Sequence, residues 1–231
     1  MRHHQLSRRA VLQRGLLLGV GGWAAALTGC SSLETRPPAS TPTTTASPTT
    51  TGGGTTANRI LLAYFSRPGE NYYYGGRRNL EVGNTEVLAR MIAELIDCDV
   101  YRIEATDPYP TSYDATVARN VREQNTDAKP AIADPLASIE PYDTVLLGSP
   151  IWNVRPPMIM TTFTESYDFT GMTVHPFVTY AVSGLGSTER DYAASTPGAR
   201  IAPGLAVQGE EVTQHRADVE TWLRDAGLLT T

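Results

Sequence analysis

The chain has 231 residues, a formal net charge of −5 and 41% hydrophobic residues, and its acidic balance argues against nucleic acid and anionic lipid as partners. Its first 29 residues and the Ser/Thr/Pro-rich tract after them differ in composition from the rest, which leaves one domain, 59–231, large enough for a sizeable core. After residue 30, no stretch is apolar for long enough to span a bilayer.

The first 29 residues resemble a bacterial twin-arginine signal peptide. Arg8 and Arg9 stand within the segment SRRAVLQ, and a short apolar run follows from Leu16 to Leu27. The run ends in LTGC, residues 27–30, which resembles the lipobox of bacterial lipoproteins. This resemblance implies that Cys30 is lipidated with diacylglycerol and anchors the protein to the outer face of the cytoplasmic membrane, for which two acyl chains suffice. A plain cleaved signal and an uncleaved anchor are the alternatives.

Residues 30–58 are expected to form a disordered tether that begins at the lipidated cysteine. Ser, Thr, Pro, Ala and Gly dominate the segment, which has almost no large apolar residue to bury. As a coil it would reach about 25–30 Å. With Cys30 lipidated, Cys98 has no partner for an internal disulfide. We interpret Cys98 as a small buried hydrophobe, with a reactive thiol as the alternative.

Beyond residue 58, strand patterns alternate with helix patterns. Residues 59–65 and 144–148 are continuous apolar runs, typical of strands covered on both faces. The alternation predicts an α/β fold with a doubly wound, five-stranded parallel sheet, whose ligands bind beyond the C-terminal strand ends at the switch point. In chain order we predict strand 59–65, helix 84–96, strand 99–103, helix 112–124, strand 144–148, helix 156–165, strand 173–180, helix 187–194, strand 200–207 and helix 211–226.

The loop after the first strand, Ser66 to Thr85, has the groups that a phosphate needs. Ser66 stands at the strand end, and Asn84 and Thr85 stand at the start of the following helix, where backbone N–H groups attract an anion. These residues would converge if the segment between them loops out. Taken alone, Asn84 or Thr85 is better explained as a helix N-cap.

Two further loops follow the third and fourth strands. The first of them contains Trp152, which would cover an aromatic ligand by stacking or would pack into the core. The second contains Gly184 and Gly186, which would let backbone N–H groups approach a planar ring closely or would form an ordinary turn.

Taken together, these loops resemble those of the flavodoxin family, over residues 59–226. The insertion between Arg67 and Gly83, the phrase ESYDF at 165–169 and the ending around Trp222 are similar to a bacterial flavodoxin-like lipoprotein subfamily with a long first loop. The four motifs that carry the family resemblance are YFSR at 64–67, GNT at 83–85, LGSPIW at 147–152 and SGLGS at 183–187.

The resemblance implies a three-layer flavodoxin fold with strand order 2-1-3-4-5 and non-covalent FMN. The phosphate would be held by Ser66, Arg67, Asn84 and Thr85. The isoalloxazine ring would be flanked on one side by Pro150, Ile151, Trp152 and Asn153, and lined on the other by Ser183, Gly184 and Gly186. The chain departs from many relatives at Asn153, where they have a second tryptophan, and at Ala181 and Val182, where they often have glycines.

The implied function is electron transfer, or flavin-dependent reduction of a small-molecule acceptor such as a quinone, at the outer face of the cytoplasmic membrane. A reductase needs an open pocket for its second substrate, which the tyrosines at 72–74 in the insertion would build or close. The sequence specifies neither the redox partner nor the acceptor, and it predicts no catalytic triad and no metal site. The alternative is a flavodoxin-fold protein without FMN that binds an envelope ligand or partner, which Asn153, Ala181 and Val182 favour.

Overall fold

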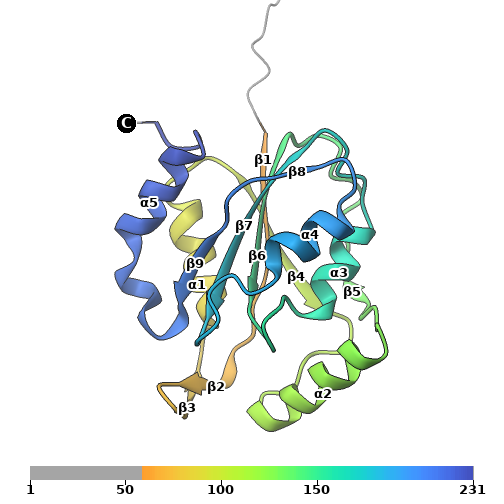
Figure 1. Ribbon diagram of the computed structural model, residues 1–231, viewed down its shortest axis with the longest axis vertical. Coiled ribbons are helices and arrows are strands. Elements are labelled where there is room, and N and C mark those ends of the chain that lie inside the picture. The colour runs from red at the N-terminus through yellow and green to blue at the C-terminus, as the bar shows by residue number, and fades with distance from the viewer. Residues whose placement is uncertain (1–58, 231) are drawn as a thin grey trace, which may run out of the picture. The chain divides into compact units, whose positions relative to one another are not determined.

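A computed structural model describes residues 59–230 of the chain (Figure 1). The predicted signal peptide, the lipidation site Cys30 and the tether lie outside these described residues. Within the described range, no helix combines the length and the apolar character needed to cross a membrane.

The domain is built on one central sheet in which the predicted strand order is confirmed. The order is β5-β4-β1-β6-β7-β8, and β9 also pairs with β7. Apart from β5, which is antiparallel to β4, the strands of this sheet are parallel. The strands are β1 Ile60–Phe65, β4 Asp99–Ala105, β5 Ile132–Ala133, β6 Thr144–Pro150, β7 Thr173–Tyr180, β8 Arg200–Ile201 and β9 Leu205–Gln208.

Helices cover both faces of the sheet, so the domain has three layers (Figure 1). Helices α1 and α5 lie on one face, and α3 and α4 lie on the other. The helices are α1 Asn84–Ala93, α2 Tyr113–Asn125, α3 Met158–Glu165, α4 Thr188–Ser195 and α5 Arg216–Asp225, with the 3-10 helix η1 at Gly209–Gln214.

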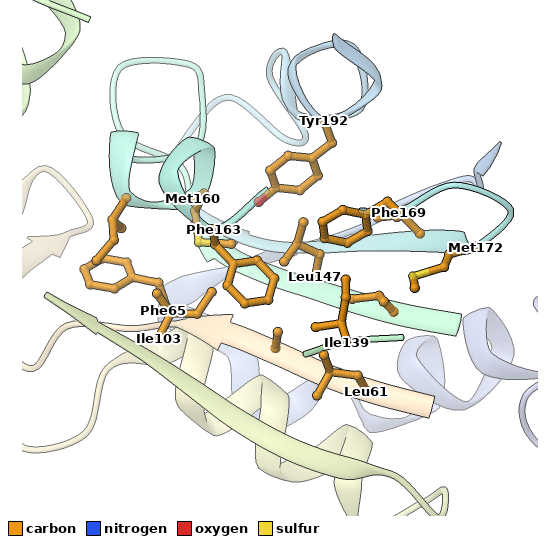
Figure 2. Close-up of a cluster of buried hydrophobic side chains, with 14 of the residues drawn as sticks. Leu61, Phe65, Ile103, Ile139, Leu147, Met160, Phe163, Phe169, Met172 and Tyr192 are labelled. Atoms are coloured by element: carbon orange, nitrogen blue, oxygen red, sulfur yellow. The ribbon is translucent and has the colours of Figure 1, made fainter. Parts of the chain in front are cut away.

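Each face of the sheet has its own hydrophobic core, because successive side chains of a strand point to opposite sides. On β1, Leu61 and Phe65 join one core and Leu62 joins the other. Figure 2 shows the first core, in which Phe163 from α3 and Tyr192 from α4 are both fully buried. The continuous apolar run of β1 reflects this burial on both faces.

The structure differs from the sequence-based elements in four places. The short antiparallel strand β5 was not predicted, and with it and the division of the last strand the sheet has seven strands among the described residues instead of the predicted five. The predicted strand 200–207 is divided into β8 and β9 around Pro203, which has no N–H to donate, and the register with β7 shifts by one residue between them. The predicted helix 211–226 begins as η1 and becomes α-helical only at Arg216. Inside the long first loop lies an unpredicted antiparallel hairpin, β2 Gly69–Tyr73 and β3 Gly76–Leu80, which forms a separate two-stranded sheet.

Candidate functional site

A cleft of about 620 Å³ opens at the C-terminal ends of β1, β6 and β7. This volume is typical of small-molecule sites. The walls come from the start of α1, the hairpin, one side of α2, η1, and the loops after β6 and β7. The cleft brings together all of the residues predicted to hold the cofactor except Gly184 and Gly186. Contacts of these residues with FMN remain a prediction.

One end of the cleft favours an anion. Ser66 Oγ accepts a hydrogen bond of 3.1 Å from the backbone N–H of Glu86, in the first turn of α1. The N–H groups of Asn84 and Thr85 lie at the open end of the same helix, where they have no intrahelical acceptor. The buried carboxylate of Glu86 does not oppose an anion there with a free charge, because it is paired with Arg90 and, at 3.0 Å, with Arg102. The helix end therefore keeps its attraction for a phosphate.

Arg67 reaches this end of the cleft as a buried cation bound by carbonyl groups. Its guanidinium donates to the carbonyls of Pro110 at 3.0 Å and Thr111 at 3.1 Å, and also to those of Pro68 and Glu70. Its buried Nε has no hydrogen-bond partner among the described residues. In the described part of the chain no carboxylate forms a salt bridge with the side chain, although the charge of Glu70 acts on it. Burial lowers the pKa of Arg67 from its ordinary value, yet arginine stays protonated. Most of its N–H groups are therefore committed to backbone carbonyls, and Arg67 offers a phosphate in the cleft chiefly its positive charge.

A pair of threonines lies next to this end. Thr85 Oγ1 and Thr179 Oγ1, at the end of β7, are 2.7 Å apart, and both residues are buried. When one hydroxyl donates to the other, one hydroxyl hydrogen is left over for a ligand. Sequence reasoning did not identify Thr179, because it reads as an interior position of a buried strand.

At the other end, the loop after β6 carries Trp152 into both the cleft and the core. The indole ring packs edge-to-face against Phe65, with centroids 5.6 Å apart, and against Tyr109, with centroids 5.2 Å apart. It remains only partly buried and lines the cleft. Trp152 therefore packs against the core and also lines the cleft, where stacking on a ligand remains a prediction.

The following two residues of this loop, Asn153 and Val154, have left-handed backbone conformations, with φ of 53° and 61°. Asparagine tolerates this region, whereas for a β-branched valine it is strained. Contacts with neighbouring segments hold the conformation. Asn153 Nδ2 donates to Gln124 Oε1 of α2 at 2.9 Å, and Ser187 N donates to the Val154 carbonyl at 2.9 Å.

Gly184 and Gly186, in the loop after β7, do not line the cleft, where they were predicted to line one side of the ring. A Cβ at Gly186 would lie 2.2 Å from the carbonyl oxygen of Val154, so this glycine lets the two loops approach each other. Gly184 faces open space in a turn, with φ of 56°. Of this loop, Ser183 lines the cleft together with Ala181 and Val182. Val182 is 83% exposed, so it stands at the rim and does not fill the cleft.

Helix α2 supplies a wall that sequence reasoning missed. The side chains that line the cleft follow the spacing i, i+3, i+4, i+7, i+8 of one helix face. Among them, Val117 and Val121 are each 43% exposed on a helix that is otherwise mostly polar. Two apolar residues four positions apart on a polar helix were the available signal. The cleft-lining residues of α2 are Tyr113, Thr116, Val117, Asn120 and Val121.

A family model described as Flavodoxin matches residues 79–226. This chain belongs to the flavodoxin family. No curated protein matches its sequence. Among solved structures, a candidate flavoprotein from Bacteroides eggerthii DSM 20697 is 25% identical with a TM-score of 0.59, over 74% of this chain and 99% of that one. One from Bacteroides uniformis ATCC 8492 is 29% identical with a TM-score of 0.57, over 72% and 98%. The flavoprotein from Lactobacillus acidophilus NCFM, solved with FMN, is 18% identical with a TM-score of 0.49, over 68% and 98%.

The cleft of this flavodoxin fits FMN in shape and charge. A Cβ at Gly83 would lie 2.6 Å from the Arg67 carbonyl oxygen, so glycine is required where the backbone approaches the anion-favouring end. A Cβ at Gly209 would lie 2.5 Å from Asn84 Nδ2 and would displace that amide. The positive charge of Arg67, which forms no salt bridge among the described residues, suits the phosphate. Trp152 and the valines of α2 give the other end the apolar walls that a planar ring needs.

Proposed function

We propose that this flavodoxin binds FMN non-covalently in the cleft and uses it to transfer electrons. A single observation carries the proposal: one cleft joins an anion-favouring end, with the buried cation Arg67, to an end with apolar walls. FMN, when bound, supplies electron-transfer and hydride chemistry. The chain itself provides binding, orientation and exclusion of water.

The residues divide between the two ends of the cofactor. Ser66, Asn84 and Thr85 would donate hydrogen bonds to the phosphate, and Arg67 would neutralise part of its charge. The ring would lie at the other end, where Pro150, Ile151, Trp152, Asn153 and Ser183 line the cleft.

The surroundings of the cleft mouth favour reduction of an uncharged acceptor, such as a quinone. Val117, Val121, Val154 and Val182 line the cleft and are exposed, with Val182 the most exposed at 83%. Among the described residues that line the cleft, only Arg67 and Glu210 carry a charge. Carriers that dock by charge complementarity use charged rims, whereas the lining of this cleft is mostly uncharged. With the lipid anchor predicted at Cys30, the reaction would take place at the outer face of the cytoplasmic membrane.

Titration of the purified, flavin-free protein with FMN and with riboflavin tests the proposed function. A site that holds the phosphate must bind FMN at least ten times more tightly than riboflavin. Equal affinities would refute the phosphate assignment, and no binding of either flavin would favour the alternative of an FMN-free binding protein. For the acceptor, the reduced holoprotein should be reoxidised faster by an uncharged quinone than by a quinone of similar potential that carries a sulfonate.

A further inference from the structure

The hairpin β2–β3 is an insertion whose position depends on its contacts with the rest of the domain. Its two-residue turn, Tyr74-Gly75, has φ of 44° and 83°, as in the type I′ turns that suit the twist of paired strands. An isolated two-stranded hairpin is at best marginally stable in water. Figure 1 shows it at the same end of the sheet as α2. The position of the hairpin therefore depends on its contacts with the rest of the domain, which we call its anchors.

One anchor attaches the hairpin to the start of α2. Glu70 N donates to the Thr111 carbonyl at 2.8 Å, and Glu70 Oε2 accepts from the first N–H of the helix, at Tyr113, at 3.0 Å. On the other strand, Arg77 makes two hydrogen bonds to the carboxylate of Asp114, of 2.9 and 2.6 Å. The same guanidinium lies 4.6 Å from the centre of the Tyr113 ring.

A second anchor attaches the turn of the hairpin to η1. The hydroxyl of Tyr74 donates to Glu211 Oε1 at 2.8 Å, and the Tyr74 backbone N–H donates to Glu210 Oε1 at 3.2 Å. The hairpin thus connects α2 with η1, two segments that form separate walls of the cleft. Between the anchors, Asn71 and Tyr72 line the cleft.

This arrangement places the hairpin beside the end of the cleft that favours a phosphate. The hairpin segment begins just after Arg67 and ends just before Gly83, so both of its ends lie near the anion-favouring end. Arg67 itself binds carbonyls on both sides, at Glu70 in the hairpin and at Thr111 before α2. A phosphate monoester can end at this point, whereas a flavin dinucleotide would have to continue past the hairpin.

We propose that the hairpin is a strap that closes the phosphate end of the cleft, selects FMN over flavin dinucleotides and slows FMN release. The proposal rests on the proposed FMN function. The strap must open before a phosphate can leave, so the FMN dissociation rate depends on the stability of its anchors. Each decade of change in that rate corresponds to about 1.4 kcal/mol of lost anchoring.

The double substitution Tyr74→Phe with Arg77→Ala removes the contacts of one side-chain polar group from each anchor: the Tyr74 hydroxyl bond to Glu211, and the Arg77 contacts with Asp114 and Tyr113. The matched control is Tyr73→Phe with Arg78→Ala, which removes the same atoms from neighbouring positions. Arg78 lies over the Tyr73 ring, 5.0 Å from its centre, and neither residue contacts α2 or η1 through a side-chain hydrogen bond in the described structure. None of the four residues lines the cleft. The wild type, the anchor variant and the control are each loaded in turn with FMN, riboflavin and FAD. Flavin fluorescence measures the affinity and the dissociation rate of each flavin.

We expect the anchor variant to release FMN at least ten times faster than the wild type and the control, with unchanged riboflavin dissociation. Its preference for FMN over FAD should fall at least tenfold. An unchanged FMN rate and FMN-to-FAD ratio, or equal changes in the control, would overturn the strap while leaving the FMN function intact. A wild type that binds no flavin would overturn both proposals. If the double variant does not fold, the single variants Tyr74→Phe and Tyr73→Phe are compared instead. Faster FMN release from Tyr74→Phe alone would support the strap, and equal rates would overturn it.

Discussion

The hydroxyl pair of Thr85 and Thr179 allows the predicted phosphate site to be distinguished from ordinary core packing. The two Oγ1 atoms are 2.7 Å apart, and the residues are 1% and 5% exposed. Replacing Thr85 with alanine leaves the Thr179 hydroxyl buried without its partner, which should lower the free energy of unfolding of the apo-protein by about 1–3 kcal/mol.

If Thr85 also donates to the phosphate, the variant loses a hydrogen bond to a charged group, which is worth about 1.5–3 kcal/mol. The affinity for FMN should then fall roughly 10- to 150-fold, since about 1.4 kcal/mol is one decade. Affinity for riboflavin, which has no phosphate, should stay the same. The preference for FMN over riboflavin is therefore the quantity that separates the two roles.

Calorimetric titration with both flavins, together with denaturant unfolding of the apo-protein, measures these quantities. Thr164→Ala is the matched control, because Thr164 is equally buried, donates to the Ser195 hydroxyl at 2.8 Å and lies outside the cleft. The control should lose stability with no change in flavin preference. If Thr85→Ala behaves like the control, the threonine pair is a structural contact and the phosphate is held elsewhere.

Three further predictions concern other parts of the chain. Trp152→Ala should weaken FMN binding more than tenfold in calorimetric titration; a large drop in apo-protein melting temperature with unchanged affinity would make Trp152 a core residue only. Burial lowers the pKa of His175 to about 4. As the pH falls below about 6.5, the unfolded chain therefore binds a proton at His175 that the folded protein binds only near pH 4. Stability should fall by up to about 3 kcal/mol between pH 6.5 and 4, and urea unfolding of His175→Gln should show a smaller fall. Cys30→Ala should release the domain from membranes; retention in the membrane pellet would indicate an uncleaved anchor.

Much of the domain could be predicted from local patterns. The apolar runs of β1 and β6 indicated strands buried on both faces, and the alternation with helices predicted the parallel sheet. The four loop motifs predicted the family, and both the sheet and the family are confirmed. The switch-point rule placed Ser66, Asn84 and Trp152 at one edge of the sheet, where the structure brings them together in the cleft. These features were readable because burial and backbone geometry leave their marks within a few consecutive residues.

The remaining features depend on contacts between segments that are distant in the sequence. The family resemblance assigned Arg67 to the phosphate, but Arg67 binds the Thr111 carbonyl 44 positions away, a contact that the sequence did not show. Gly186 was assigned to the ring face, yet its lack of a Cβ serves the close approach of Val154. The hairpin is held by Tyr74 and Arg77 through partners on η1 and α2. Such roles are set by which elements pack against each other, and the local spacing of residues carries no record of those neighbours.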